Sequence, residues 1–113
     1  MRVFDGLVRA WSLTEAEQLS LLGLHEIADL EMVRRGPLDD VPTDVAERLA
    51  TLLDIFRSIN TLLPVPDRAD AWLRRPNAHP LFAGGTVLNL MLNRQGNGLV
   101  ATRDYLRGQI AGP

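Results

Sequence analysis

Apolar residues recur through most of the chain at the three- and four-residue spacing that places them on one face of an α-helix. The longest such stripe predicts a helix from about Asp44 to Leu62, opened by Pro42 and Thr43. Its apolar members are Val45, Leu49, Leu52, Leu53, Phe56, Ile59 and Leu63. A stripe of several turns needs other elements to cover it, so we expect this helix to be the spine of the fold.

Two shorter helices are predicted near the N-terminus. The first carries one apolar face, made of Phe4, Leu7, Val8 and Trp11. The second begins with a capping box, in which the hydroxyl of Thr14 and the carboxylate of Glu17 each accept a hydrogen bond from a backbone N–H group at the helix start. Gly23 then favours the end of this helix, because glycine readily adopts the left-handed conformation found at helix C-termini.

A third helix is predicted from about His25 to Arg35, stopped by Gly36 and Pro37. Together with the second helix and its short glycine turn, it follows the helix-turn-helix plan. The N-terminal half is therefore predicted to be helix-turn-helix-like, with the long central helix after it.

The charges of the third helix argue against DNA binding. Glu26, Asp29 and Glu31 occupy its exposed positions, where phosphates would repel carboxylates. Arg34 and Arg35 come only at the last turn, where arginines also complement the helix dipole. The formal net charge of −2 gives no sign of a basic surface. We expect this chain alone to bind operator DNA weakly, and an assembled complex to supply the missing phosphate contacts.

The proline-rich link at residues 64–66 divides the chain into an N-terminal part, residues 1–63, and a C-terminal part, residues 64–113. Neither part is expected to fold alone, so we predict one compact all-α domain. Its C-terminal half would be small and helical.

The C-terminal part begins with a short predicted helix that carries Trp72 and is capped by Asp67. Gly84 and Gly85 then allow a sharp turn, because glycine adopts backbone angles that other residues avoid. Thr86 is predicted to cap the next helix, which would run to about Asn93.

The last predicted helix has an apolar stripe made of Leu99, Thr102, Leu106 and Ile110. Arg103 and Arg107 lie beside the stripe at a spacing where like charges slightly destabilise an isolated helix. Two interpretations stay open at this point: both arginines are solvated, with Asp104 relieving their repulsion, or they meet acidic groups on a partner.

The composition gives no support for catalysis. A chain of 113 residues is the size of one ordinary domain, and it has no cysteine and two isolated histidines. That combination disfavours disulfides and a conventional zinc site. Its glycine cluster lacks the lysine of a phosphate-binding loop, and its serines lack a histidine and acid context. We therefore expect a binding protein, not an enzyme, with no metal and no cofactor.

A cytoplasmic location is expected as well. No apolar run approaches the length needed to cross a bilayer, so we predict no membrane contact. The first residues lack the basic-then-apolar order of a signal peptide.

The C-terminal part resembles the toxin-binding region of the Xre/MbcA/ParS antitoxin family in the order and spacing of its motifs. The matching residues are Trp72, Leu73, Pro76, Asn77, Phe82, Gly84, Gly85, Leu88, Leu92, Gly96, Gly98, Tyr105 and Leu106. Val87 departs from the pattern, since relatives often carry proline at the first helical position. Elsewhere the match is looser, and there the family has an Xre-like helix-turn-helix. We take Trp72, Pro76, Asn77, Phe82, Gly84 and Gly85 as a structural motif, and we expect Trp72, Phe82 and Leu88 to be buried together.

The resemblance implies an antitoxin of a RES-Xre type toxin–antitoxin system. Its partner would be a RES-domain toxin that consumes NAD, inhibited within a hetero-oligomer in which the antitoxin also self-associates. The residues that would bind the toxin are Arg103, Leu106, Arg107, Gln109, Ile110, Ala111, Gly112 and Pro113. The small residues after Ile110 would extend over about 10 Å and enter the toxin's NAD site as a plug.

Two other functions remain alternatives at this stage. In the first alternative, the chain is a helix-turn-helix transcription regulator whose C-terminal half only dimerises. In the second, it is a helical adaptor unrelated to toxins. For the last residues, the alternative to a plug is a frayed terminus.

Overall fold

The computed structural model describes residues 2–37, 40–93 and 97–112 and confirms an all-α fold within them. Its elements are α1 (Arg2–Ala10), α2 (Glu15–Leu22), α3 (Ile27–Arg35), α4 (Thr43–Leu62), α5 (Pro66–Trp72), the 3-10 helix η2 (Pro80–Phe82), α6 (Val87–Leu92) and α7 (Gly98–Ala111). Within these ranges, β-type pairing is limited to an isolated bridge between Pro76 and Thr86. None of the helices described combines the length and apolar character that crossing a bilayer requires.

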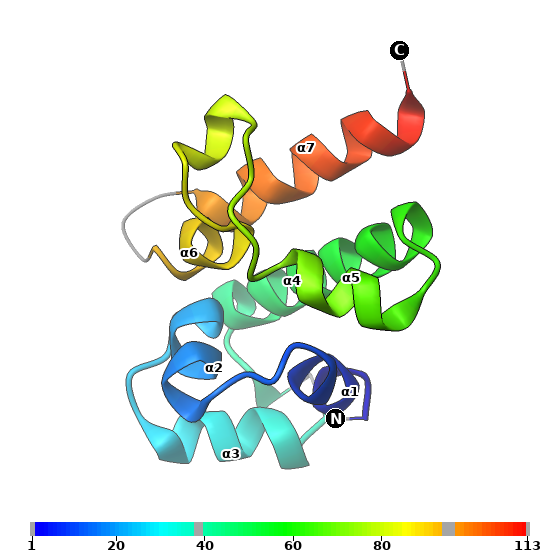
Figure 1. Cartoon of the computed structure of the whole chain (residues 1–113). Helices are drawn as coiled ribbons and strands as arrows, with labels where there is room; N and C mark the ends of the chain where they lie inside the picture. Colours follow the sequence, from blue (N-terminus) through cyan, green and yellow to red (C-terminus); the bar gives the residue numbers. More distant parts are fainter. Residues whose placement is uncertain (1, 38–39, 94–96, 113) are drawn as a thin grey trace.

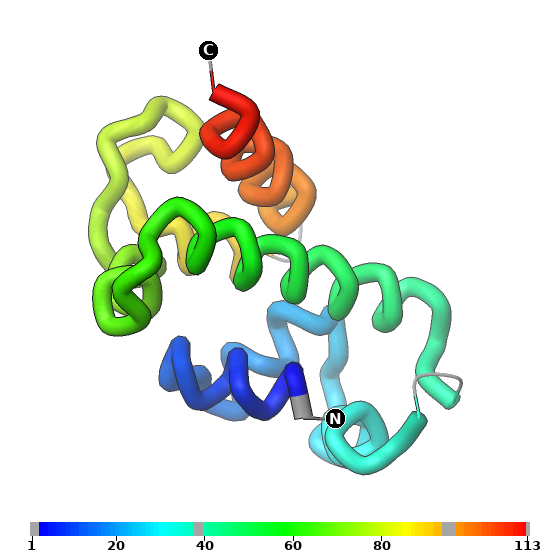
Figure 2. Tube along the Cα trace, turned by 90° about the vertical axis from the view of Figure 1, so that its right-hand side faces the viewer, coloured from blue at the N-terminus to red at the C-terminus, as the bar shows by residue number. Residues whose placement is uncertain are grey.

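Helix α4 lies between two layers of helices (Figure 1, Figure 2). One layer holds α1, α2 and α3, the other holds η2, α6 and α7, and α5 packs near the C-terminal end of α4. The buried residues of α4 are Val45, Leu49, Leu52, Ile55, Ser58 and Ile59. Because α4 is covered from two sides, its buried face includes Ile55, whereas Leu53 and Phe56 of the predicted stripe are only partly buried.

The N-terminal helices follow their predicted signals. The backbone N–H of Glu17 donates to the Thr14 hydroxyl at 3.1 Å, and that of Thr14 donates to the Glu17 carboxylate at 2.9 Å, so the capping box is confirmed. Gly23 ends α2 with a left-handed φ of 71°. Helix α3 begins at Ile27, later than predicted, because Glu26 has an extended backbone and is the N-cap residue.

The two tryptophans differ in burial, and the prediction for Trp72 holds only in part, because this residue packs against the core but is partly buried. Phe82 and Leu88 are 5% and 3% exposed, as expected, but Trp72 is only half-buried. Helix α5 is short and buries only Ala69 among its residues, so Trp72 lies at the edge of the core. The tryptophan at the centre of the core is Trp11, which is 1% exposed.

The predicted N-cap residue is wrong for α5 and confirmed for α6. Helix α5 begins at Pro66 with Val65 as its N-cap, so the predicted capping by Asp67 is wrong. A proline fits at the first helical position because the N–H group it lacks has no helical partner there. In α6 the prediction is confirmed, since the Thr86 hydroxyl accepts a hydrogen bond from the N–H of Asn89 at 3.0 Å.

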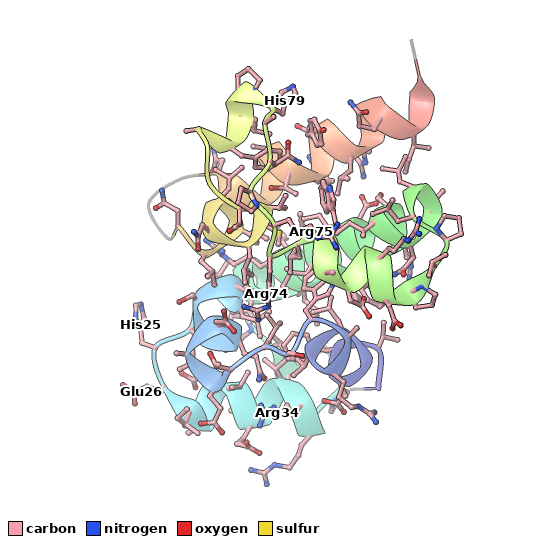
Figure 3. The ribbon with its side chains drawn as sticks, in the orientation of Figure 1. His25, Glu26, Arg34, Arg74, Arg75 and His79 are labelled. Carbon is pink, nitrogen blue, oxygen red and sulfur yellow. The ribbon has the colours of Figure 1, made fainter. Side chains whose placement is uncertain are left out.

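Arg74, just after α5, connects the two layers (Figure 3). Its guanidinium donates to the carbonyl oxygens of Trp11 at 2.9 Å and Ser12 at 3.1 Å, and it forms an ion pair with Glu17 at 3.2 Å. Burial alone would raise the pKa of the Glu17 carboxyl. The hydrogen bond from the Thr14 N–H and the nearby Arg74 guanidinium outweigh that effect and lower this pKa. The capping box of α2 is therefore also the point where the C-terminal part is attached.

Candidate functional site

Helix α7 packs along α4 and is held firmly at its start. Gly98 approaches α6 so closely that a Cβ atom there would clash with the carbonyl oxygen of Leu90. The buried side chains that follow on α7 are Leu99, Thr102 and Leu106. Ile110, the last residue of the predicted stripe, is instead 45% exposed. The helix is thus anchored along its first turns, while its last turn leaves the core.

Arg103 and Arg107 each have a carboxylate partner within the chain. The guanidinium of Arg103 lies 3.1 Å from the carboxylate of Asp104, and that of Arg107 lies 2.5 Å from the carboxylate of Asp54 on α4. Relief of the repulsion between the two arginines therefore comes from both Asp104 and Asp54. An acidic group on a partner protein would have to replace Asp54 before it could bind Arg107.

The last turns of α7 hold the exposed members of the predicted toxin-binding set, and this end of the helix points away from the rest of the molecule (Figure 1, Figure 2). These members are Arg107, Gln109, Ile110, Ala111 and Gly112. The helix continues through Ala111, so the extended tail predicted to begin there starts only at Gly112, whose φ is 74°. Leu106 is 1% exposed, so its side chain supports this surface from inside. Pro113 lies outside the described residues, as does Gly96 of the family motif.

An apolar groove of about 170 Å³ lies beneath this end of α7. Its lining residues are Ile59, Leu62, Leu63, Trp72, Tyr105, Leu106 and Gln109. Trp72 is half-buried because its ring forms one wall of the groove. Leu62 is 37% exposed, which adds apolar surface at the rim. A groove of this kind can receive an apolar side chain of a partner protein.

Most residues of the structural motif close the loop between α5 and α6. The N–H of Asn77 donates to the carbonyl oxygen of Gly85 at 2.9 Å, and Pro76 pairs with Thr86 across the base of the loop. Gly84 has a φ of 82°, a conformation that glycine adopts without steric cost. The motif therefore acts through backbone geometry.

Three aromatic rings join this loop to α7. The ring of Tyr105 lies 4.7 Å from that of His79 and 5.4 Å from that of Phe82, measured between centroids, and both contacts are edge-to-face. His79 is oriented by the N–H of Leu81, which donates to its Nδ1 atom at 3.1 Å (Figure 3). The loop and α7 thus form one packed unit, with Phe82 buried between them.

Helix α3, whose suitability for DNA is in question, carries charges of both signs. Glu26 is exposed at the outer edge of the α2–α3 turn (Figure 3). The guanidinium of Arg34 is held by Glu31 at 3.0 Å and by the side-chain oxygen of Gln18 at 2.6 Å. These contacts hold the Arg34 side chain against α2 and α3. Arg35 is therefore the more exposed arginine of α3.

A wider cavity of about 500 Å³ separates the start of α4 from the start of α7. Its charged residues are Asp44, Glu47, Arg48 and Arg103. Acidic and basic groups line it together, so it favours neither an anion nor a cation. In the part of the chain that the structure describes, no group of three histidine or acidic side chains is arranged to hold a metal ion.

Sequence reasoning found the buried face of α7 but missed the contacts made by three other residues. Arg74, Asp54 and His79 act through partners that lie far away in the sequence or in another element. No local pattern marks such contacts. The paired arginines at 74 and 75 were visible in the sequence, but nothing there distinguishes Arg74, which is bonded, from its neighbour.

The chain is similar over nearly its whole length to a protein of another organism. No protein-family model matches the chain. Over 112 residues it is 30% identical to the uncharacterized protein y4oB of Sinorhizobium fredii, and the alignment covers 99% of this chain and 84% of that protein.

Proposed function

We propose that this chain, which belongs to the same protein family as y4oB of Sinorhizobium fredii, is an antitoxin that binds and inhibits a RES-type toxin that degrades NAD. In this proposal, the end of α7 binds at the mouth of the toxin's active site. The residues after α7 then block entry of NAD. The sequence resemblance to the Xre/MbcA/ParS antitoxins supports the partner class, and the exposed end of α7 supports the proposed mode of inhibition.

The observation that carries the proposal is a helix that is packed on the core along its first turns and has an exposed end. Its buried stripe stops at Leu106, and the next turn, residues 109–112, is exposed. An inhibitor that is already ordered loses little conformational entropy on binding. Beyond Ile110 the side chains are small, which suits entry into a narrow site.

The groove and the arginines beside this end define the surface that the toxin would need. An apolar side chain of the toxin would fill the groove between Trp72 and Tyr105. A toxin carboxylate would replace Asp54 as the partner of Arg107, whose side chain is 57% exposed and accessible. A charge-assisted bond of this kind is strong when its geometry is bidentate.

The proposal is tested by co-expressing the chain with the product of the adjacent reading frame, which the proposal expects to be a RES-domain protein. We expect the two proteins to co-purify and the complex to leave NAD unconsumed. Ile110→Asp should weaken inhibition at least about tenfold, because it puts a charge into the contact. Val100→Asp is the matched control, since Val100 is 41% exposed on the anchored half of α7, and it should inhibit normally.

Failure to co-purify, or equal losses in the two variants, would contradict the proposal. A helix-turn-helix regulator is the second candidate, because α2, Gly23 and α3 follow that plan in sequence order. The acidic groups of α3 weaken this alternative. A DNA shift assay separates the two: tight, sequence-specific binding by the chain alone at physiological salt would favour the regulator.

A further inference from the structure

A small cavity lies between α3 and the start of α4, at the end of the molecule opposite α7 (Figure 1, Figure 2). Its volume is about 220 Å³. Apolar walls are formed by Met32 and Val33 of α3 and by Val41 and Val45 on the side of α4. Pockets for small molecules usually occupy about 300–1,000 Å³, so this α3–α4 cavity is better matched in size to one side chain of a partner protein.

The charged residues that line the α3–α4 cavity are both acidic. They are Asp29 of α3 and Asp40, which lies just before α4. Both are exposed, and neither forms a salt bridge with any residue that the structure describes. Glu26, one turn before Asp29, adds a third exposed carboxylate at this end of α3. The cavity therefore combines an apolar interior with a negatively charged rim.

Met32 makes the apolar wall accessible from outside. Its side chain is 52% exposed, whereas Leu30 and Val33 on the inner side of α3 are 0% and 2% exposed. Ala28, one turn before Met32, is exposed as well and extends the apolar strip. A methionine side chain is flexible and polarisable, so it adapts to apolar groups of different shape. An exposed apolar strip beside a cavity is typical of a contact surface.

An arginine side chain has the chemistry that this arrangement requires. Its apolar stem packs along Met32 and Val45, while its charged end stays at the rim of the cavity. The guanidinium has five N–H donors, which suit carboxylates such as those of Asp29 and Asp40. The same carboxylates repel the phosphates of DNA. Within the described residues, no group of three histidine or acidic side chains is placed to hold a metal ion instead.

We infer that the α3–α4 cavity binds an arginine side chain of a basic polypeptide, with an apolar neighbour of that arginine packed on Met32. This surface lies away from the end of α7, so the inference does not depend on toxin binding there. Helix α3 has the place of the second helix in the helix-turn-helix plan, which contacts base edges in DNA-binding proteins. In this chain the helix recognises a protein instead, because the side chains around the cavity are acidic and apolar.

The test uses the full chain labelled with nitrogen-15 and a blocked tripeptide, acetyl-Leu-Arg-Leu-amide. Changes in the NMR shifts of backbone amides locate the contact and measure its affinity. We expect them in residues 28–33 and 40–46, which border the cavity. A second peptide with citrulline in place of arginine keeps the length and the apolar side chains but removes the charge. It should bind at least about tenfold more weakly.

Two double variants separate the rim of the cavity from the general charge of the chain. Asp29→Asn with Asp40→Asn removes both carboxylates of the rim, so the dissociation constant of the arginine peptide should rise at least about tenfold. Glu15→Gln with Asp67→Asn is the matched control, because these exposed acids begin α2 and α5 and do not line the cavity. It changes the net charge equally and should alter the dissociation constant by less than about twofold. Circular dichroism checks that all helices are retained.

A loss of affinity in the rim variant but not in the control supports the inference. Equal binding of the arginine and citrulline peptides, equal losses in the two double variants, or shifts elsewhere in the chain would overturn it. So would the absence of shifts at peptide concentrations up to about 10 mM.

Other occupants of the cavity are distinguished in parallel. Sedimentation equilibrium shows whether the chain is a dimer that the arginine peptide dissociates, and in that case a second copy fills the cavity and the inference is wrong. A DNA duplex that shifts the same amides would also overturn it, because this face would then bind nucleic acid.

Discussion

Helices α3 and α7 lie at opposite ends of the molecule, and each carries two arginines, but the surroundings of these arginines differ. In α3, Arg34 is bound to neighbouring side chains, whereas Arg35 is exposed and forms no salt bridge with any residue that the structure describes. In α7, Arg103 and Arg107 both pair with carboxylates, one of them from α4. The exposed end of α7 is mainly apolar or small, and the exposed face of α3 carries both charges.

The difference shows what an amphipathic pattern does and does not determine. In both helices the spacing of apolar residues identifies the side that packs on the core. The chemistry of the outer side depends on residues from other elements, such as Asp54, which neutralises Arg107, or Asp40, which adds a second carboxylate near Asp29. The sequence therefore predicts which side of each helix is buried, but not which side chains accompany its exposed residues.

The largest expected effect is the difference in lost stability between alanine substitutions of Trp11 and Trp72. Trp11→Ala should cost about 3–5 kcal/mol of stability, because Trp11 is 1% exposed and packs edge-on against Phe56 with ring centroids 5.7 Å apart. Trp72→Ala should cost only about 1–2 kcal/mol, because Trp72 is half-buried beside the groove. Urea denaturation of both variants measures the difference. Equal losses would mean that Trp11 and Trp72 contribute equally to the stability of the core.

The next effect concerns the connection between the layers. Arg74→Met removes hydrogen bonds to the carbonyl oxygens of Trp11 and Ser12 as well as the ion pair with Glu17. The free energy of unfolding should fall by about 1–2 kcal/mol, and the partial exposure of the guanidinium keeps this loss small. Arg75→Met is the control next in sequence and should change the unfolding free energy by less than about 0.5 kcal/mol. A result in which the two variants cannot be distinguished would show that Arg74 does not connect the layers.

The all-α fold and the position of most helices are predictable from the sequence because they depend on local signals. The capping box of α2, the glycine after it and the long stripe of α4 act within a few residues. The burial of Trp72 was not predictable, because it depends on how short α5 packs against α4 and α7. The end of α7 was identified as a candidate site from its motif, but the Asp54 contact and the groove require the folded chain.

A smaller effect is the pH dependence of stability, to which the carboxyls of Glu17 and Asp70 contribute with opposite signs. The pKa of Glu17 is lowered, so its stabilising contribution is present above its unfolded value and is lost as pH falls through the folded pKa. Burial and the charge of Asp67 raise the pKa of Asp70, so its charged form opposes folding at neutral pH. Near pH 7, Glu17→Gln should lower stability and Asp70→Asn should raise it, each by less than about 1 kcal/mol.

Both differences from the unaltered chain should shrink as the solution becomes acidic. The effect of Asp70 should fade first because its pKa is raised, and that of Glu17 last because its folded pKa is lowered. Thermal midpoints measured at several pH values follow this change. Shifts of the same sign in the two variants would contradict the assignment.

The smallest stability effect concerns the ion pair at the end of α7. Asp54→Asn should change the unfolding free energy by about 0.5 kcal/mol or less, because the pair is at the surface. It also frees Arg107 to bind an acidic group of the toxin, so inhibition should improve roughly two- to fivefold. Titration of NAD consumption against antitoxin concentration measures this. Weaker inhibition would mean that Asp54 positions Arg107 for the toxin rather than competing for it.

The most direct measurement of the antitoxin proposal removes Ala111, Gly112 and Pro113 and keeps the anchored part of α7. Complex formation is followed by co-purification, and NAD consumption is measured with the truncated protein at saturation. If the residues after the anchored helix block the NAD site, the truncated chain should still bind the toxin with most of its affinity while the complex consumes NAD. If it inhibits as completely as the full chain, the blocking role of these residues is wrong, and inhibition must come from the side of α7.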